Sequence, residues 1–280
     1  MRTHWLKTLA VAAIMLAASS LWSADTPAQT AWGILQNAAA DKSTNKRANA
    51  VRVLGLITGD LKAAATAEKA LEDEKADVRA AAAAALGEMD AKGSIPKLRK
   101  ALSDKEPKVI LASARSLVQL KDDPPAYEVF YAVLTGQQKT GNGLVASQLQ
   151  SLQNPKALAE LGVGFVPFGG IGVFTFNALT KDDVSPVRAA AANALAKDPD
   201  PQTTKALVQA VSDKSWVVRM GALQAIAKRA NPALLKNIQG AMSDDKDPVR
   251  YTASAAVIRL TNLERAVKPE QGKKRTRKTG

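Results

Sequence analysis

Apolar and polar positions follow the period of a helix along most of the chain, in stretches such as KADVRAAAAAALGEM (75–89) and SWVVRMGALQAIAKR (215–229). In the first stretch, a small residue (Ala82) and a large aliphatic one (Leu86) stand four and eight residues after Val78. Because offsets of four and eight fall on one helical face, such stretches predict helices with one apolar face. Alanine, the strongest helix former, is abundant on these faces. The pattern therefore predicts an all-α protein.

The same pattern recurs at a fixed interval. Aligning the similar stretches gives one anchor position in each, and successive anchors are separated by about 31 residues or a multiple of it. The anchors are Val78, Val109, Val187, Val218 and Val249, with Lys46 in the same register of a weaker copy. A second amphipathic helix fits in the remainder of each interval, as in SIPKLRKALSD (94–104) and TTKALVQAVSD (203–213). Helix pairs repeated in this way predict an α-solenoid, in which each unit buries its apolar face against its neighbours.

Two charged positions accompany every anchor. An aspartate stands five residues before it, and an arginine directly follows it in every copy except one, where Ile110 takes the place. We expect each aspartate to lie in the loop before a helix, where its carboxylate can accept backbone N–H bonds. The aspartates are Asp41, Asp73, Asp104, Asp182, Asp213 and Asp244, and the arginines are Arg47, Arg79, Arg188, Arg219 and Arg250.

This pattern of an aspartate, a Val-Arg pair and an Ala-Leu face resembles the HEAT-like repeats of the phycobilin-lyase type. The resemblance covers roughly residues 32–264 and implies about seven helix-pair repeats. It also implies a ladder between successive repeats, formed by Asp73, Arg79, Asp104, Asp182, Arg188, Asp213, Arg219, Asp244 and Arg250. We interpret this Asp–Arg ladder as structural, because a position that repeats is first a stacking position. The fold itself serves scaffolds, chromophore-lyase subunits and DNA-repair enzymes, so it does not define an activity.

One repeat is interrupted. About 78 residues separate Val109 from Val187, where two periods need about 62. The excess of about 12 residues coincides with LGVGFVPFGGIGVFTF (161–176), which holds four of the five phenylalanines of the chain. Glycine and proline make a continuous helix unfavourable there. We therefore predict an insertion at 162–176, with Phe165, Pro167, Phe168, Phe174 and Phe176 as its interaction residues.

The sequence allows three interpretations of this insertion. Its phenylalanines could fill the core of a degenerate repeat, or form an exposed apolar loop that docks a partner. The segment could also insert shallowly into a membrane, since residues 161–180 carry no charge. A membrane-spanning role is rejected, because it would place the two repeat blocks on opposite sides of a bilayer. We favour an outward or mixed role.

The first 24 residues have the three-part layout of a secretory signal peptide. Arg2 and Lys7 precede an apolar core (8–18), and small residues follow around Ala24. A retained N-terminal anchor is the alternative, although the apolar core is short for a span. We predict a periplasmic or secreted protein divided into a signal peptide (1–24), a repeat solenoid (25–264) and a basic disordered tail (265–280).

Candidate chemistry is limited by composition. The chain has no cysteine, and its only histidine, His4, lies in the predicted signal peptide. The mature chain then offers no Ser-His-Asp or Cys-His nucleophile arrangement and no thiolate or imidazole zinc ligand. We predict no catalytic residue, no metal site, no cofactor and no enzymatic activity.

The C-terminal tail is strongly basic and contributes to a formal net charge of +13. Its candidate interaction residues are Lys273, Lys274, Arg275, Arg277 and Lys278. For an exported protein, an anionic membrane surface or an envelope polymer is a better partner for such a tail than nucleic acid, which we exclude.

The leading functional hypothesis is a non-enzymatic, exported scaffold that binds another envelope protein. The alternatives are a peripheral membrane protein that uses the 162–176 loop and the basic tail, and a lyase-like enzyme subunit suggested by the repeat resemblance alone.

Overall fold

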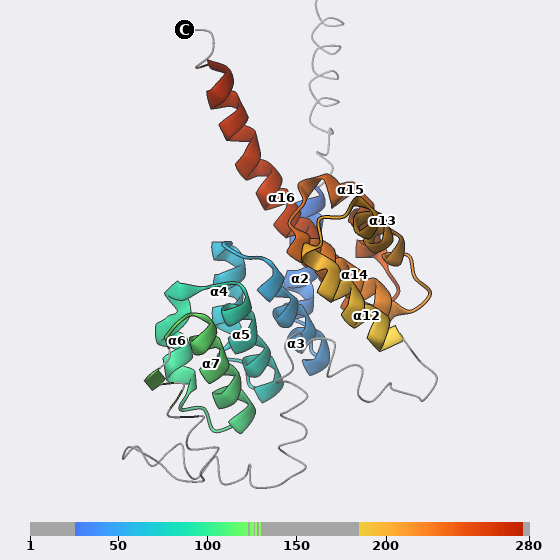
Figure 1. The fold of residues 1–280 in the computed structure, drawn as a ribbon. Helices are drawn as coiled ribbons and strands as arrows, with labels where there is room; N and C mark the ends of the chain where they lie inside the picture. The colour runs from blue at the N-terminus through green and yellow to red at the C-terminus, as the bar shows by residue number, and fades with distance from the viewer. Residues whose placement is uncertain (1–25, 123, 126, 128, 130–184, 277–280) are drawn as a thin grey trace, which may run out of the picture.

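The computed structural model describes residues 26–122, 124, 125, 127, 129 and 185–276 (Figure 1). Every regular element within these ranges is an α-helix or a short 3-10 helix (η), so the all-α prediction is confirmed. In the N-terminal block the elements are α2 Pro27–Ala39, α3 Thr44–Val53, η1 Leu54–Leu56, α4 Leu61–Ala70, α5 Ala76–Glu88, η2 Lys92–Ser94, α6 Ile95–Ala101 and α7 Pro107–Gln119. In the C-terminal block they are α12 Ser185–Ala194, η4 Leu195–Lys197, α13 Pro201–Ala210, α14 Trp216–Arg229, η5 Pro232–Leu234, α15 Leu235–Ile238, η6 Gln239–Ser243 and α16 Asp247–Thr276.

The helices alternate between two kinds. The anchor helices, which carry the repeated anchor position, are α3, α5, α7, α12, α14 and α16, and the companion helices that precede most of them are α2, α4, α6, α13 and α15. Local signals start the companion helices: Thr26 and Gln29 form a capping box at α2, and the Asp60 carboxylate accepts the Ala63 N–H at 2.9 Å at α4. Pro201 occupies the first turn of α13.

The core lies between consecutive anchor helices. The anchors Val78, Val109, Val218 and Val249 are at most 2% exposed, as the repeat pattern predicts. Val187 differs, because 66% of it is exposed. It belongs to α12, the first described helix after residue 184, and no described unit precedes it. Within the described structure, α12 buries Ala189 and Ala192, of which Ala189 lies against α14, and the anchor side chain stays exposed.

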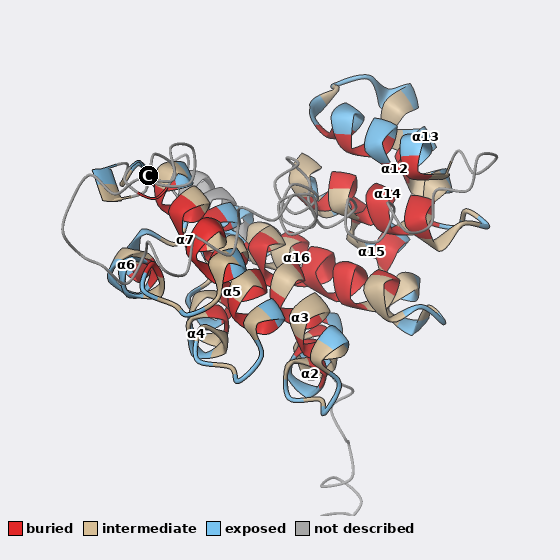
Figure 2. Ribbon diagram, turned by 90° about the horizontal axis from the view of Figure 1, so that it is seen from below, coloured by how far each residue is buried: buried red, intermediate tan, exposed pale blue. Residues whose placement is uncertain are grey.

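The two blocks do not form a simple line from the first repeat to the last. Anchor helices pack in the order α3, α5, α7 in one block and α12, α14, α16 in the other, as expected of a solenoid. In addition, α16 packs against α2 and α3, so the last unit lies beside the first (Figures 1 and 2). The first repeat is consequently an interior unit, and one hydrophobic core extends from Ala31 to Leu260 across both blocks.

Polar contacts stabilise the junction between α16 and the first unit. Arg259 of α16 donates from Nη1 to the Leu56 carbonyl at 2.7 Å and to Thr58 Oγ1 at 2.8 Å. Asn262 Nδ2 donates to Asp60 Oδ2 at 2.7 Å. The carboxylate that caps α4 therefore also holds α16, which links the two ends of the chain.

The sequence places the start of a disordered tail at residue 265, whereas the described helix α16 does not end there. Instead of becoming disordered there, α16 continues as one helix of 30 residues to Thr276 and projects from the body (Figure 1). Leu263 packs against the core, and the following residues include the good helix formers Arg265 and Ala266. The helix also passes Pro269 and Gly272, which disfavour a helix interior, so helix propensity alone does not explain the continuation.

Within the described residues, none of the helices combines the length and apolar character that crossing a membrane requires.

Candidate functional site

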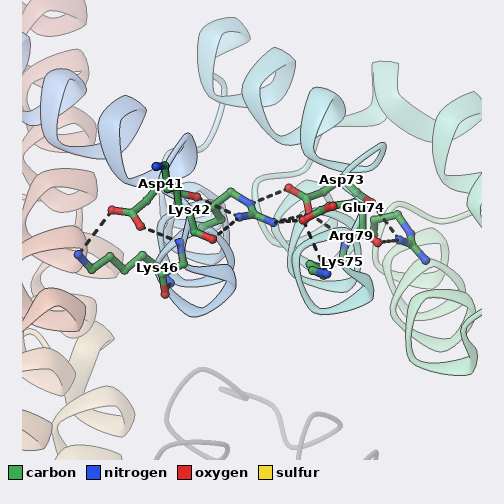
Figure 3. Close-up of polar contacts among 9 residues, drawn as sticks. Asp41, Lys42, Lys46, Asp73, Glu74, Lys75 and Arg79 are labelled. Atoms are coloured by element: carbon green, nitrogen blue, oxygen red, sulfur yellow. Dashed lines mark hydrogen bonds and ion pairs between the residues drawn. The ribbon is translucent and has the colours of Figure 1, made fainter.

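The Asp–Arg ladder connects neighbouring units along one edge of the stack. Arg47 donates from Nε and Nη2 to the two carboxylate oxygens of Asp73, at 2.9 and 3.0 Å. Arg79 binds Asp104 in the same two-pronged way at 2.7 and 2.8 Å. Each arginine therefore reaches the aspartate of the next unit, as Figure 3 shows for the first repeats.

The C-terminal block repeats this geometry. Arg219 binds both oxygens of Asp244 at 2.7 and 2.8 Å, and Arg188 makes a single bond to Asp213 at 2.5 Å. Arg250 belongs to the last described unit and donates to the Asp244 carbonyl and the Asp247 carboxylate. Asp182 lies outside the described residues.

Each ladder residue also orders its own loop. The Nη1 of Arg79 donates to the Asp73 carbonyl at 2.9 Å, and that of Arg219 donates to the Asp213 carbonyl at 3.0 Å. The aspartate carboxylates accept the backbone N–H two residues later, as in Lys75 to Asp73 at 2.8 Å. In each repeat, the ladder residues therefore connect the loop before the anchor helix, the start of that helix and the corresponding loop of the next unit.

Electrostatics agree with a structural role for the ladder. The Arg188 hydrogen bond and the Ser215 N–H hold the pKa of Asp213 below its ordinary value. Burial alone would raise the pKa of Asp104, but the hydrogen bonds from Arg79 and the Glu106 N–H outweigh it and lower that pKa. Because these charges are satisfied by their neighbours, the ladder offers little to a ligand.

The other predicted interaction residues are not brought together by the described structure. Phe165, Pro167, Phe168, Phe174 and Phe176 of the insertion lie outside the described residues, as do Arg277 and Lys278 of the tail. Lys273, Lys274 and Arg275 fall on the backbone of α16 near its end.

Sequence reasoning missed a charged cluster, which we define as Arg52 of α3, Glu88 of α5, Arg115 of α7 and Lys228 of α14. Glu88 lies within electrostatic reach of all three cations. Lys228 belongs to the C-terminal block, so the cluster exists because the two blocks pack together. It holds three cations and one carboxylate.

The surrounding protein disfavours the charged forms of the cluster's side chains. Burial lowers the pKa of Arg52, and the nearby Arg115 lowers it further, while Glu88 raises it. Burial also lowers the pKa of Lys228. Solvent reaches the Glu88 side chain, but desolvation by the surrounding protein still raises its pKa. The positive charges of Arg52, Lys228 and Arg115 act in the opposite direction and lower it. The local environment thus disfavours charges of both signs.

A neighbouring polar network extends from this cluster. Lys228 Nζ donates to Asn193 Oδ1 at 3.2 Å, and Asn193 Nδ2 donates to Gln224 Oε1 at 3.2 Å. These residues repeat in register: Arg52, Arg115, Asn193 and Gln224 stand six residues after an anchor, and Glu88 and Lys228 stand ten after one. Since offsets of six and ten differ by four, they share a helical face. That periodicity is the signal that could have identified the face from sequence.

The repeat pattern matches a known family. The sequence profile of HEAT repeats matches residues 33–118, 64–140 and 174–259, which together exceed half of the chain. The chain is a HEAT-repeat protein. A comparison with curated proteins gives no match.

Solved structures of helical-repeat proteins align along most of this HEAT-repeat chain. The complex of CpcE and CpcF of phycocyanin lyase from Nostoc sp. PCC7120 is 21% identical, with 86% of this chain and 94% of that chain covered and a TM-score of 0.33. Human deoxyhypusine hydroxylase is 17% identical, with 84% and 97% covered and a TM-score of 0.33. A designed armadillo repeat protein is 16% identical, with 84% and 100% covered and a TM-score of 0.26.

The HEAT repeats and the charged cluster together define what the site can do. Stacked helix pairs present an extended surface suited to binding another protein. No group of three or more acidic, histidine or cysteine side chains suited to a metal occurs in the described ranges 26–122 and 185–276. The chemistry available at the cluster is recognition of an anionic group by guanidinium and ammonium donors.

Proposed function

We propose that this HEAT-repeat protein is a non-enzymatic, exported scaffold that binds another protein of the cell envelope. The anchor-helix face around the charged cluster is the proposed binding surface. A carboxylate-bearing segment of the partner is the chemistry that fits it.

One observation carries the proposal: Arg52, Arg115 and Lys228 all lie within electrostatic reach of Glu88, at a place where the protein environment disfavours charge. A carboxylate of the partner would accept hydrogen bonds from the arginines, whose planar groups suit carboxylates. The same contact would reduce the repulsion between Arg52 and Arg115. Because Arg52 and Lys228 come from opposite blocks, such a partner would also hold the blocks together.

Site-specific photo-crosslinking in the native cells tests this proposal. Gln119 stands ten residues after its anchor, on the same face as the cluster, and it is exposed. A photoreactive residue at Gln119 should give a crosslinked partner. The matched control position is Lys69 on the companion helix α4, which is also exposed and should give none.

Charge variants decide whether the cluster makes the contact. Arg52→Gln combined with Lys228→Gln should reduce the Gln119 crosslink at least about tenfold, since charge-assisted hydrogen bonds are the strong ones. Lys69→Gln combined with Lys205→Gln removes the same charge from exposed positions elsewhere and should leave the crosslink unchanged. Equal crosslinking by both double variants would refute the proposed surface.

Export is tested separately. Cell fractionation should find the protein outside the cytosol, and N-terminal sequencing should place the first residue near Ala24 or Asp25. Full-length protein in the cytosol would contradict this part of the proposal.

A further inference from the structure

Glu88 is the acidic member of the charged cluster, and its exposure differs from that of the three cations. Glu88 is exposed, whereas Arg52, Arg115 and Lys228 are half-buried. The surrounding protein is nevertheless close enough to disfavour the charge of its carboxylate. Glu88 is therefore the member of the cluster that solvent, and an approaching partner, reaches most readily.

Close packing determines where the Glu88 carboxylate lies. A Cβ added to Gly55 of η1 would lie 2.6 Å from Glu88 Oε2, 3.0 Å from Glu88 Cβ and 3.3 Å from Ala85 Cα. A glycine at this position therefore leaves the room that the Glu88 side chain occupies. Since η1 directly follows α3, which carries Arg52, the packing of α3 and η1 on α5 places the carboxylate near Arg52.

The cations reach this carboxylate from three other helices. Anchor helices pack in the order α3, α5, α7, so Arg52 of α3 and Arg115 of α7 approach Glu88 of α5 from its two neighbours. Lys228 approaches from α14 of the other block, and its Nζ also donates to Asn193 Oδ1 at 3.2 Å. Glu88 thus already lies beside the groups that the proposed function assigns to a carboxylate of the partner.

We propose that Glu88 determines the specificity of this binding surface, as a resident carboxylate that competes with the partner's carboxylate for Arg52 and Arg115. This inference rests on the proposed function, because it concerns the same site. Two carboxylates beside one group of cations repel each other, so a partner has to displace Glu88 or bind against its charge. Only a segment that makes further contacts on the surface overcomes this competition, and such a cost excludes weaker partners.

Fluorescence anisotropy with a labelled hexaglutamate peptide tests the proposal on the purified protein. Glu88→Gln removes the resident charge and keeps the size of the side chain. It should bind hexaglutamate at least about threefold more tightly than the unmodified protein does. Glu88→Ala removes the same charge without adding an amide group, and it should also bind more tightly. Arg52→Gln should weaken binding.

Glu72→Gln is the matched control for net charge. Glu72 is exposed in the loop before α5, whereas Glu88 is the last residue of that helix, so the length of α5, about 18 Å, separates them. This variant should leave the affinity for hexaglutamate unchanged. Equal gains in Glu72→Gln and Glu88→Gln would overturn the proposal. A loss of affinity in Glu88→Gln would overturn it too, because Glu88 would then position the arginines instead of competing for them. Undetectable binding of hexaglutamate by Glu88→Gln would also overturn it.

Photo-crosslinking at Gln119 separates this inference from the scaffold proposal. Glu88→Gln should raise the yield of the crosslinked partner. An unchanged or lower yield, with a crosslink that still depends on Arg52 and Lys228, would refute competition by Glu88 and leave the scaffold proposal standing. A crosslink that does not depend on Arg52 and Lys228 would refute the proposed surface itself.

Discussion

Arg79 and Arg219 show how single side chains hold neighbouring units together. Each makes two hydrogen bonds to an aspartate of the next unit and one to a carbonyl of its own loop. Charge-assisted, two-pronged pairs are stronger than neutral hydrogen bonds and restrict geometry. A residue that repeats along the chain thereby fixes the spacing between successive helix pairs.

Arg219→Ala should destabilise the protein by about 1–2 kcal/mol, because it leaves the Asp244 carboxylate without its main partner at the border of solvent. Arg188→Ala is the matched comparison and should cost less. Arg188 makes one bond to its aspartate, and 47% of its side chain is exposed, against 14% for Arg219. Urea denaturation measures both. An equal or larger loss for Arg188→Ala would contradict this account.

Acid should weaken the ladder. The pKa of Asp213 is lowered by the Arg188 hydrogen bond and the Ser215 N–H, so the unfolded chain takes up a proton before the folded one as pH falls. Stability is thus fully present above the ordinary aspartate pKa of about 4 and is lost in the acid range below it, as pH falls through the lowered pKa of the folded state. Urea midpoints measured across this range should fall. Asp213→Asn, which removes one titrating group, should lose less stability on acidification than the unchanged protein.

Close helix contacts depend on glycine at selected places. A Cβ on Gly221 of α14 would lie 2.8 Å from Ala189 Cβ and 2.9 Å from Ala189 Cα and O. Two of these three atoms belong to the backbone of α12, so the added methyl group would push the helices apart. Gly33 of α2 has no atom within 4 Å of the corresponding position.

Gly221→Ala should therefore destabilise the protein by about 1–3 kcal/mol through overpacking. Gly33→Ala places the same methyl group in open space within a helix and should stabilise by about 0.5–1 kcal/mol. Thermal unfolding of both variants gives the comparison. A stabilising Gly221→Ala would show that α12 and α14 can separate at little cost.

Packing of α16 on the first unit joins the two blocks into one body. Arg259 and Asn262 supply the polar contacts, and the apolar core continues across the junction. The first and last described units consequently stabilise each other, which a linear solenoid does not require.

A chain cut once between the blocks should therefore stay assembled. With a protease site introduced between Gly141 and Asn142, the two fragments should co-elute in gel filtration after cleavage. Arg259→Ala should weaken the association by about 1–2 kcal/mol, because it removes hydrogen bonds from a charged donor. Gly33→Ala serves as a control that leaves the junction intact. Separation of the unmodified fragments at micromolar concentration would contradict the packing of α16 on α2 and α3.

Local features of the fold were predictable from sequence because they depend on neighbours along the chain. The repeat spacing located the anchor helices, and the Asp and Arg positions indicated the ladder, since each pair joins consecutive units. Residues with a left-handed backbone conformation were less predictable. Asp90, Lys121 and Ala230 all have φ near +60° and all stand twelve residues after an anchor, although none is a glycine. At Asp90 and Lys121 this conformation ends a helix, because the next N–H donates back to the carbonyl five residues earlier, from Ala91 to Leu86 at 3.0 Å and from Asp122 to Leu117 at 2.8 Å.

The sequence by itself determined the helix type, the repeat length and the pairing of adjacent units, because periodicity and capping act over a few residues. Only the tertiary structure decided that α16 packs against the first unit, that it continues past residue 265, and that Arg52, Glu88, Arg115 and Lys228 meet. The packing of α16 on the first unit joins residues about 200 positions apart, and the four charges meet across the two blocks. Their physical cause is the complementarity of two folded surfaces, which no local pattern encodes.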